Sequence, residues 1–118
     1  MTLWGSGSPR REFLFSDDLV QACMLLLDAN LDELELPINI GPGDDVSIRE
    51  LAEIIAGVVG YQGSLEWDTS KPDGTPRKLL DSARMKAMGW TTKTSLEDGI
   101  RQTYDWYLGQ KAMEPVTK

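Results

Sequence analysis

The 118-residue chain contains no histidine and only one cysteine. Without histidine it lacks the commonest general base and the commonest metal ligand of proteins. The single Cys23 excludes an internal disulfide, and its place in an apolar run predicts a buried core thiol rather than a nucleophile. Because the other ligand types are scattered carboxylates, we expect no metal site.

Positive charge is also scarce. Twelve Lys and Arg residues face 19 Asp and Glu residues, which gives a net charge of −7 and an isoelectric point near 4.5. Binding to nucleic acid by phosphate neutralisation needs a surplus of basic residues, so we expect no nucleic-acid partner. An anionic ligand would need a local basic pocket.

Long apolar runs are missing as well. The longest apolar stretch, Leu19–Leu27, is interrupted by Gln21 and is too short to cross a bilayer. The first residues do not follow the pattern of a signal peptide. We therefore expect a cytoplasmic protein that does not engage a membrane.

A chain of this length fits one domain with a thin core. We expect that domain over residues 1–109 and a frayed tail over residues 110–118. The expected fold class is α/β, of the α+β-like kind found in small lobes, with three to four helices and short strands. Capping and periodicity predict helices at 16–29, 48–59, 82–88 and 95–108, and short strands at 12–15, 37–40 and 64–67.

The first predicted helix is apolar on nearly every side, whereas a surface helix shows a single apolar stripe. A short chain has few elements with which to cover such a helix. We therefore expect residues 17–29 to leave apolar surface exposed, where a missing domain would otherwise bury it. Self-association of the chain through this helix is the predicted consequence.

The glycine-rich start, Gly5–Gly7, does not fit a phosphate-binding loop, because we expect neither a strand before it nor a helix after it. Trp4 and Arg11 flank this loop. An indole ring and a guanidinium group together can hold a nucleotide, through apolar area and through bidentate pairing with phosphate. The alternative is a partly buried tryptophan beside surface arginines.

A second candidate is the loop Lys71–Lys78, in which two prolines and one glycine restrict the backbone. Its Asp73 lies among cations and could accept hydrogen bonds from sugar hydroxyls. The alternative is a solvated charged turn. The pair Asp17 and Asp18 could in principle serve acid–base chemistry, but acidic residues in the first turn of a helix are already explained by the helix dipole.

Several segments together resemble the C-terminal third of the GDP-L-fucose synthases, which are extended short-chain dehydrogenase/reductases. The similarity covers Leu3 to about Leu108. The run Ser70-Lys-Pro-Asp-Gly-Thr-Pro-Arg-Lys78 is the most specific part, and the others are Trp4–Leu14, Asp17–Leu19, Asn39–Gly41, Ser47–Ala52, Val58–Tyr61, Gly89–Trp90 and Thr103–Trp106.

The resemblance implies the substrate-binding lobe of such an enzyme without its Rossmann domain. Family members convert GDP-4-keto-6-deoxy-mannose to GDP-L-fucose by epimerisation and NADPH-dependent reduction. Their catalytic residues and cofactor glycines lie upstream of the matched region, so we expect no catalytic residue and no bound cofactor in this chain. The family's substrate contacts fall on Trp4, Arg11 and Asp73.

The resemblance thus predicts a GDP-sugar as a weakly bound partner and no catalysis by the chain alone. A free-standing module that binds a sugar nucleotide or a protein, and a folded remnant without function, are the alternatives. Phe15 stands where many bacterial members have histidine, which leaves the polarity of the pocket open.

Overall fold

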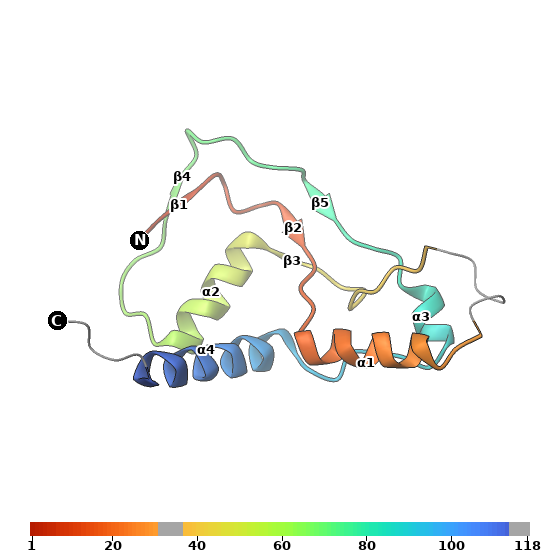
Figure 1. Ribbon diagram of the computed structural model, residues 1–118. Coiled ribbons are helices and arrows are strands. Elements are labelled where there is room, and N and C mark those ends of the chain that lie inside the picture. Colours follow the sequence, from red (N-terminus) through yellow and green to blue (C-terminus); the bar gives the residue numbers. More distant parts are fainter. Residues whose placement is uncertain (31–36, 114–118) are drawn as a thin grey trace.

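The computed structural model describes residues 1–30 and 37–113, and Figure 1 shows their arrangement. Short strands and loops form the upper part of that view, and two helices lie end to end along its lower side. The strands are β1 (Thr2–Trp4), β2 (Arg10–Arg11), β3 (Val46–Ser47), β4 (Glu66–Asp68) and β5 (Arg77–Lys78), and the helices are α1 (Ser16–Leu27), α2 (Ile48–Val59), α3 (Ala83–Ala87) and α4 (Leu96–Met113). None of the described helices is long and apolar enough to span a membrane.

The strands form two small sheets that join the start of the chain to its middle. β1 pairs with β4 in parallel, and Trp4 lies opposite Asp68. β2 lies between β3, to which it is antiparallel, and β5, to which it is parallel. These pairings place residues 2–11 beside residues 66–78, so the two candidate loops predicted from the sequence become neighbours.

The capping box predicted ahead of the second helix is confirmed. The Glu50 amide donates to the Ser47 hydroxyl over 3.1 Å, and the Ser47 amide donates to the Glu50 carboxylate over 2.7 Å. α2 ends at Gly60, whose φ of 71° is left-handed and suits glycine. Because the ionised Glu50 carboxylate accepts the bond from the Ser47 amide, its pKa is lowered.

α4 begins after Ser95, whose hydroxyl accepts a hydrogen bond from the Asp98 amide over 3.1 Å. The helix continues to Met113, four residues beyond the end predicted at Gly109. Residues 110–113 are therefore part of α4, and fraying of the tail stays a prediction. The rest of the predicted tail, 114–118, lies outside the described residues.

The strand predictions were less accurate than the helix predictions. Residues 12–15 and 37–40 form no strand, since no other described strand pairs with them. The strand predicted at 64–67 lies at 66–68, where β1 supplies a partner. Residue Glu12 is instead fixed by its carboxylate, which accepts a hydrogen bond from the Leu80 amide over 2.8 Å.

The core is small and lies between α1, α3 and the segment that follows α3. Ala22, Met85 and Trp90 are buried, and the Trp90 indole donates to the Asp18 carbonyl over 3.1 Å. The prediction that Cys23 is a core thiol is wrong: the residue is exposed, because it lies on the side of α1 that faces away from the core. Partly buried residues complete the cluster: Leu14, Leu25, Leu26, Ile38, Ile40 and Met88.

Candidate functional site

The three residues selected from the sequence meet around one pocket of about 140 Å³. Trp4 comes from the end of β1, Arg11 from the end of β2, and Asp73 from the loop between β4 and β5. The two parallel pairings, β1 with β4 and β2 with β5, bring these segments together. The remaining lining residues are Gly7, Pro9, Ile48, Pro72 and Gly74.

One wall of the pocket is the turn at residues 5–8. Gly5 and Gly7 have φ angles of 81° and 77°, which side-chain-bearing residues rarely adopt. A Cβ at Gly7 would also lie 2.7 Å from the Trp67 ring. The expectation that no strand precedes these glycines is wrong, since β1 does, but β2 follows them where a dinucleotide-binding turn would have a helix.

Asp73 holds this turn by two hydrogen bonds. Its carboxylate accepts one from the Ser6 amide over 2.8 Å and one from the Ser6 hydroxyl over 2.6 Å. These bonds, with a smaller contribution from the Ser8 hydroxyl, lower the pKa of Asp73 because they favour the ionised carboxylate. Asp73 therefore positions the turn, a role that the sequence did not reveal.

Arg49 also supports this turn. Its guanidinium donates to the Ser6 carbonyl over 2.6 Å and stacks on the Trp67 ring, with its central carbon 4.5 Å from the ring centroid. In the sequence Arg49 stands inside the capping box of α2, so its contact with a segment 43 residues earlier gave no local signal. The turn is thus held by Asp73, Arg49 and Trp67 together.

The two other candidate residues remain open to a ligand. Trp4 is 75% exposed, and the Lys71 ammonium lies 5.5 Å from its ring centroid. Arg11 is half-buried and donates one N–H to the Arg10 carbonyl over 2.6 Å. No ion pair to Arg11 is formed within residues 1–30 and 37–113, so its charge is not neutralised by a described carboxylate.

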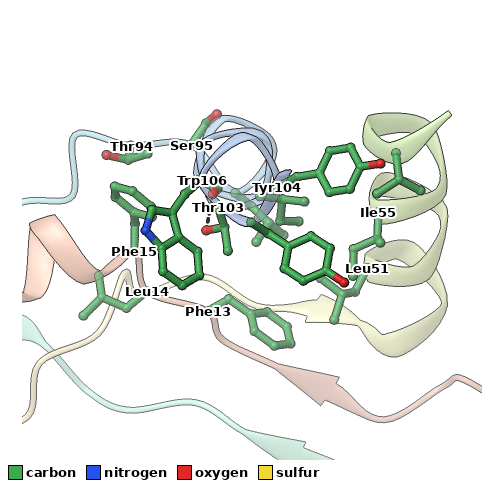
Figure 2. A pocket seen from close by; sticks show the side chains of 15 residues that line it. Phe13, Leu14, Phe15, Leu51, Ile55, Thr94, Ser95, Thr103, Tyr104 and Trp106 are labelled. Carbon is green, nitrogen blue, oxygen red and sulfur yellow. Dashed lines mark hydrogen bonds between the residues drawn. The ribbon is translucent and has the colours of Figure 1, made fainter. Parts of the chain in front are cut away.

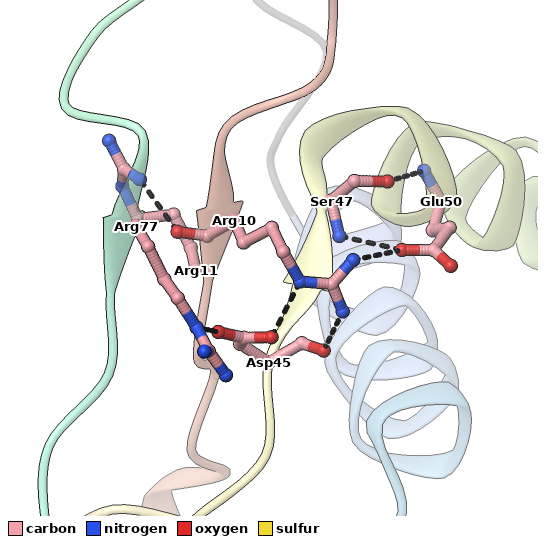
Figure 3. A network of polar contacts seen from close by, with 6 residues as sticks. All are labelled: Arg10, Arg11, Asp45, Ser47, Glu50 and Arg77. Carbon is pink, nitrogen blue, oxygen red and sulfur yellow. Dashed lines mark hydrogen bonds and ion pairs between the residues drawn. The ribbon is translucent and has the colours of Figure 1, made fainter.

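A buried carboxylate fixes the strands on which Arg11 and the cationic loop lie (Figure 3). Asp45 has a side chain that is 3% exposed, and it pairs with Arg10 over 2.7 Å and with Arg77. Arg10 also donates to the Asp45 carbonyl over 2.6 Å and pairs with Glu50 over 3.5 Å. The hydrogen bonds from Arg77 and Arg10 lower the pKa of Asp45, and the bond to Asp45 raises the pKa of Arg10.

Neighbouring arginines thus have opposite roles in this structure. Arg10 is bound on the Asp45 side of β2, while Arg11 lines the pocket without a described ion pair. Successive side chains of a strand point to opposite faces, which separates the two groups. Asp45 carried no signal in the sequence, because its partners come from strands that are 32 and 35 residues away.

The pair Asp17 and Asp18 does not form an acid–base site. Asp18 is 1% exposed, and its carboxylate accepts hydrogen bonds from the backbone amides of Lys93 over 3.1 Å and Thr94 over 3.0 Å. Asp17 is exposed on the outside of the helix. Asp18 therefore joins α1 to the loop that precedes α4.

Phe15 does not line the pocket of Trp4, Arg11 and Asp73, but it shares a second cavity of about 200 Å³ with Arg11. It also lines a larger apolar groove beside α4 (Figure 2), where its ring would lie 3.1 Å from a Cβ built on Gly99. Phenylalanine at position 15 therefore shapes that groove and the cavity shared with Arg11, and it is absent from the lining of the candidate pocket.

Residues 1–41 match the NAD dependent epimerase/dehydratase family. The chain is 58% identical to GDP-L-fucose synthase 1 of Arabidopsis thaliana over 108 residues, which are 92% of this chain and 33% of the relative. It is 47% identical to GDP-L-fucose synthase of Escherichia coli over 92% of this chain and 36% of that relative. This chain is homologous to one part of the GDP-L-fucose synthases.

The fold agrees with this homology. A GDP-L-fucose synthetase of Naegleria fowleri solved with NADP bound superposes with a TM-score of 0.84 at 28% identity, over 95% of this chain and 35% of that one. The chain spans about one third of the length of the relatives it matches. It is a small α/β unit that corresponds to part of an epimerase-type enzyme.

Proposed function

We propose that this chain forms the GDP-sugar-contacting part of a GDP-L-fucose synthase. The observation that supports the proposal is the meeting of Trp4, Arg11 and Asp73 around one pocket, on loops that are more than 60 residues apart in the sequence. Relatives that are 58% and 47% identical to this chain are named GDP-L-fucose synthases. A cytoplasmic setting is part of the same proposal.

The charges around the pocket suit a nucleotide diphosphate. Arg11 offers a guanidinium without a described ion-pair partner, and such a group can bind two phosphate oxygens at once. Lys71 adds a second positive charge beside Trp4. The exposed indole supplies apolar area against which a base or a sugar ring can pack.

Asp73 has two functions in this proposal. Its bonds to Ser6 keep the glycine turn in place, and the lone pairs left on its two oxygens can accept a hydrogen bond from a ligand. The ionised form, favoured by Ser6, is the form that accepts from a hydroxyl or an amine. Asp73 therefore shapes the pocket whether or not it touches the sugar.

The chemistry itself is proposed to need the part of the enzyme that this homology does not cover. Reduction of a keto sugar requires a nicotinamide and a proton donor held against the substrate. The glycine turn at residues 5–8 lacks the following helix that would bind a dinucleotide. We expect no oxidation of NADPH by this chain alone.

Binding by the chain alone should be weak. A charge-assisted bond from Arg11 to phosphate contributes about 1.5–3 kcal/mol when sheltered from water and less in an open pocket. The entropy of association opposes it, so the dissociation constant for GDP-mannose should be about millimolar, which corresponds to about −4 kcal/mol.

The test is an NMR titration of the chain with GDP-mannose, with GDP as a second ligand. Chemical shifts should move at Trp4, Arg11 and the loop 71–78, and Arg11→Ala should weaken binding at least tenfold. Arg101→Ala is the matched control, because Arg101 pairs with Glu97 on α4 and lines none of the described pocket. Unchanged binding in Arg11→Ala would refute the assignment.

The alternative of a free-standing binding module makes a different prediction. Asp73, Arg49 and Trp67 hold the glycine turn in place, which such a module would also need. Saturable micromolar binding in the same titration would identify a complete site and would favour that alternative. No shifts at ligand concentrations of several tens of millimolar would instead favour a folded remnant.

A further inference from the structure

The first turn of α2 donates hydrogen bonds to the glycine turn and to the residue that follows it. The Arg49 amide donates to the Gly7 carbonyl over 3.0 Å, and the Ile48 amide donates to the Pro9 carbonyl over 2.9 Å. The first amides of a helix have no acceptor within the helix, so these two carbonyls satisfy groups that would otherwise need water. The backbone of α2 therefore fixes the glycine turn at one side of the pocket.

The side chain of Arg49 adds a third bond to the same turn. Its guanidinium donates to the Ser6 carbonyl over 2.6 Å and lies on the Trp67 ring, 4.5 Å from the ring centroid. The Trp67 ring is also the group that a Cβ at Gly7 would meet at 2.7 Å. Arg49 and the glycine turn are thus held against one aromatic ring.

The place of Arg49 in α2 is not explained by the helix itself. Arg49 is the second residue of α2, where the dipole of a helix favours a negative charge. Removal of its positive charge should therefore leave the helix folded. The bond to the Ser6 carbonyl gives a physical reason for an arginine at this position.

Arg49 does not line the pocket, although Ile48 beside it does. The glycine turn connects Trp4 with Arg11, the two groups that are proposed to hold the GDP-sugar. A ligand that needs both groups at once binds only while the turn keeps them at a fitting separation. Fixing the turn before the ligand arrives lowers the entropic cost of binding.

We propose that Arg49 is a positioning residue for the GDP-sugar, which acts through the Ser6 carbonyl and the Trp67 ring and does not contact the ligand. This inference rests on the proposed function, because it requires the ligand to bind between the ends of the glycine turn. The alternative is direct attraction of a phosphate by the charge of Arg49. Against it, the guanidinium is already bound to the carbonyl and the ring and lies outside the lining of the pocket.

Two substitutions separate these roles. Arg49→Ala removes the side chain, whereas Arg49→Lys keeps a positive charge and a donor but lacks the planar fork that can bond and stack at the same time. Positioning predicts that both variants raise the dissociation constant for GDP at least fivefold, as expected if the turn keeps the binding geometry for about one fifth of the time or less. Near-normal binding by Arg49→Lys would show that charge alone suffices and would overturn the proposal.

An NMR titration with GDP follows both the affinity and the turn. In ligand-free Arg49→Ala, the amide shifts of residues 6–8 should differ from those of the unaltered chain. They should approach the shifts of the GDP-bound unaltered chain as the ligand saturates the pocket, because the bound ligand then holds both ends of the turn. A purely structural role of Arg49 predicts no such return, and far-ultraviolet circular dichroism verifies that the variant is folded.

Glu53→Ala is the matched control for Arg49→Ala. Glu53 is exposed one helical turn farther along α2 and does not line the pocket, so its loss should change neither the affinity nor the shifts. Unchanged affinity in Arg49→Ala, while the unaltered chain binds GDP, would overturn this proposal alone. Failure of the unaltered chain to bind GDP would overturn the proposed function together with it.

Discussion

The region around the pocket of Trp4, Arg11 and Asp73 (the pocket end) and the side formed by α1 and α4 (the helical side) differ in where their side chains find contacts. At the pocket end, loops are held by hydrogen bonds and ion pairs among residues 6, 49 and 73 and around Asp45. On the helical side, α1 and α4 expose large apolar side chains, including Leu27 and Trp106. The first region finds its partners within the chain, and the second presents surface that the described residues do not cover.

The difference follows from the two kinds of interaction. A hydrogen bond needs one partner at a defined distance and angle, which two adjacent strands can supply. Hydrophobic stabilisation grows with the area removed from water, so it needs many atoms on the opposite side. Among the described residues, the buried apolar core consists of Ala22, Met85 and Trp90. Because this core is small, apolar parts of the helices stay exposed, while hydrogen bonds can still order the polar pocket.

The largest loss of stability is expected from substitution of Asp18, a polar residue on the helical side whose hydrogen bonds hold α1 to the loop before α4. In Asp18→Ala, the amides of Lys93 and Thr94 lose the carboxylate that accepts their hydrogen bonds. Two such charge-assisted bonds correspond to a destabilisation of about 4 kcal/mol, a large fraction of the stability of a small domain. Urea unfolding followed by far-ultraviolet circular dichroism measures this change.

Asp17→Ala is the matched control for this prediction. Asp17 occupies the same first turn of α1 but is exposed, so its loss should cost no more than about 1 kcal/mol through the helix dipole. Equal effects of the two substitutions would show that the hydrogen bonds of Asp18 contribute nothing of their own.

At the pocket end, the largest effect is expected at Gly7. Alanine there would have to adopt a φ of 77° and would meet the Trp67 ring at 2.7 Å. Backbone strain and overpacking together should destabilise the chain by about 3 kcal/mol. Chemical denaturation gives the magnitude, and NMR shifts of Ser6 would show whether the turn has moved.

Gly57→Ala should change the stability of the chain in the opposite direction. Gly57 lies inside α2, and a Cβ at this position would meet nothing within 4 Å, so alanine should stabilise the helix by about 0.5–1 kcal/mol. A loss of stability in Gly57→Ala, or none in Gly7→Ala, would contradict this account of the two glycines.

The sequence predicted those features that depend on nearby residues. The capping box of Ser47 and Glu50, the stop at Gly60 and the apolar excess of helix 16–27 are local patterns, and the structure confirms them. The residues around the pocket came from the family resemblance, and the structure brings Trp4, Arg11 and Asp73 together. Their roles in binding stay predictions.

The features that were missed depend on contacts distant in the sequence. Asp45 gains its role from Arg10 and Arg77, and Arg49 from Ser6, all of them more than 30 residues away. The strand predicted at 37–40 failed because strand structure needs a neighbour to pair with. The exposure of Cys23 depended on which side of α1 found a core, which an evenly apolar helix does not indicate.

The smallest effect is expected from Asp73, and it appears only in acid. The bonds from Ser6 hold the pKa of Asp73 below its usual value of 3.8. A carboxyl group whose pKa is lower in the folded state stabilises the fold above the unfolded pKa, and this contribution is lost as the pH falls through the folded pKa. The urea midpoint should therefore begin to fall as the pH drops below about 5, and Asp73→Asn should reduce that fall slightly.

The Ser6 amide allows the same event to be followed at one site. Its proton is donated to the Asp73 carboxylate, so its chemical shift should follow the ionisation of Asp73 with a midpoint below pH 3.8. Asp44→Asn is the control, since Asp44 is exposed and outside the pocket of Trp4, Arg11 and Asp73. A Ser6 midpoint at or above 3.8 would mean that the turn is not held by Asp73 in solution. The pocket end would then resemble the helical side in needing a partner to complete it.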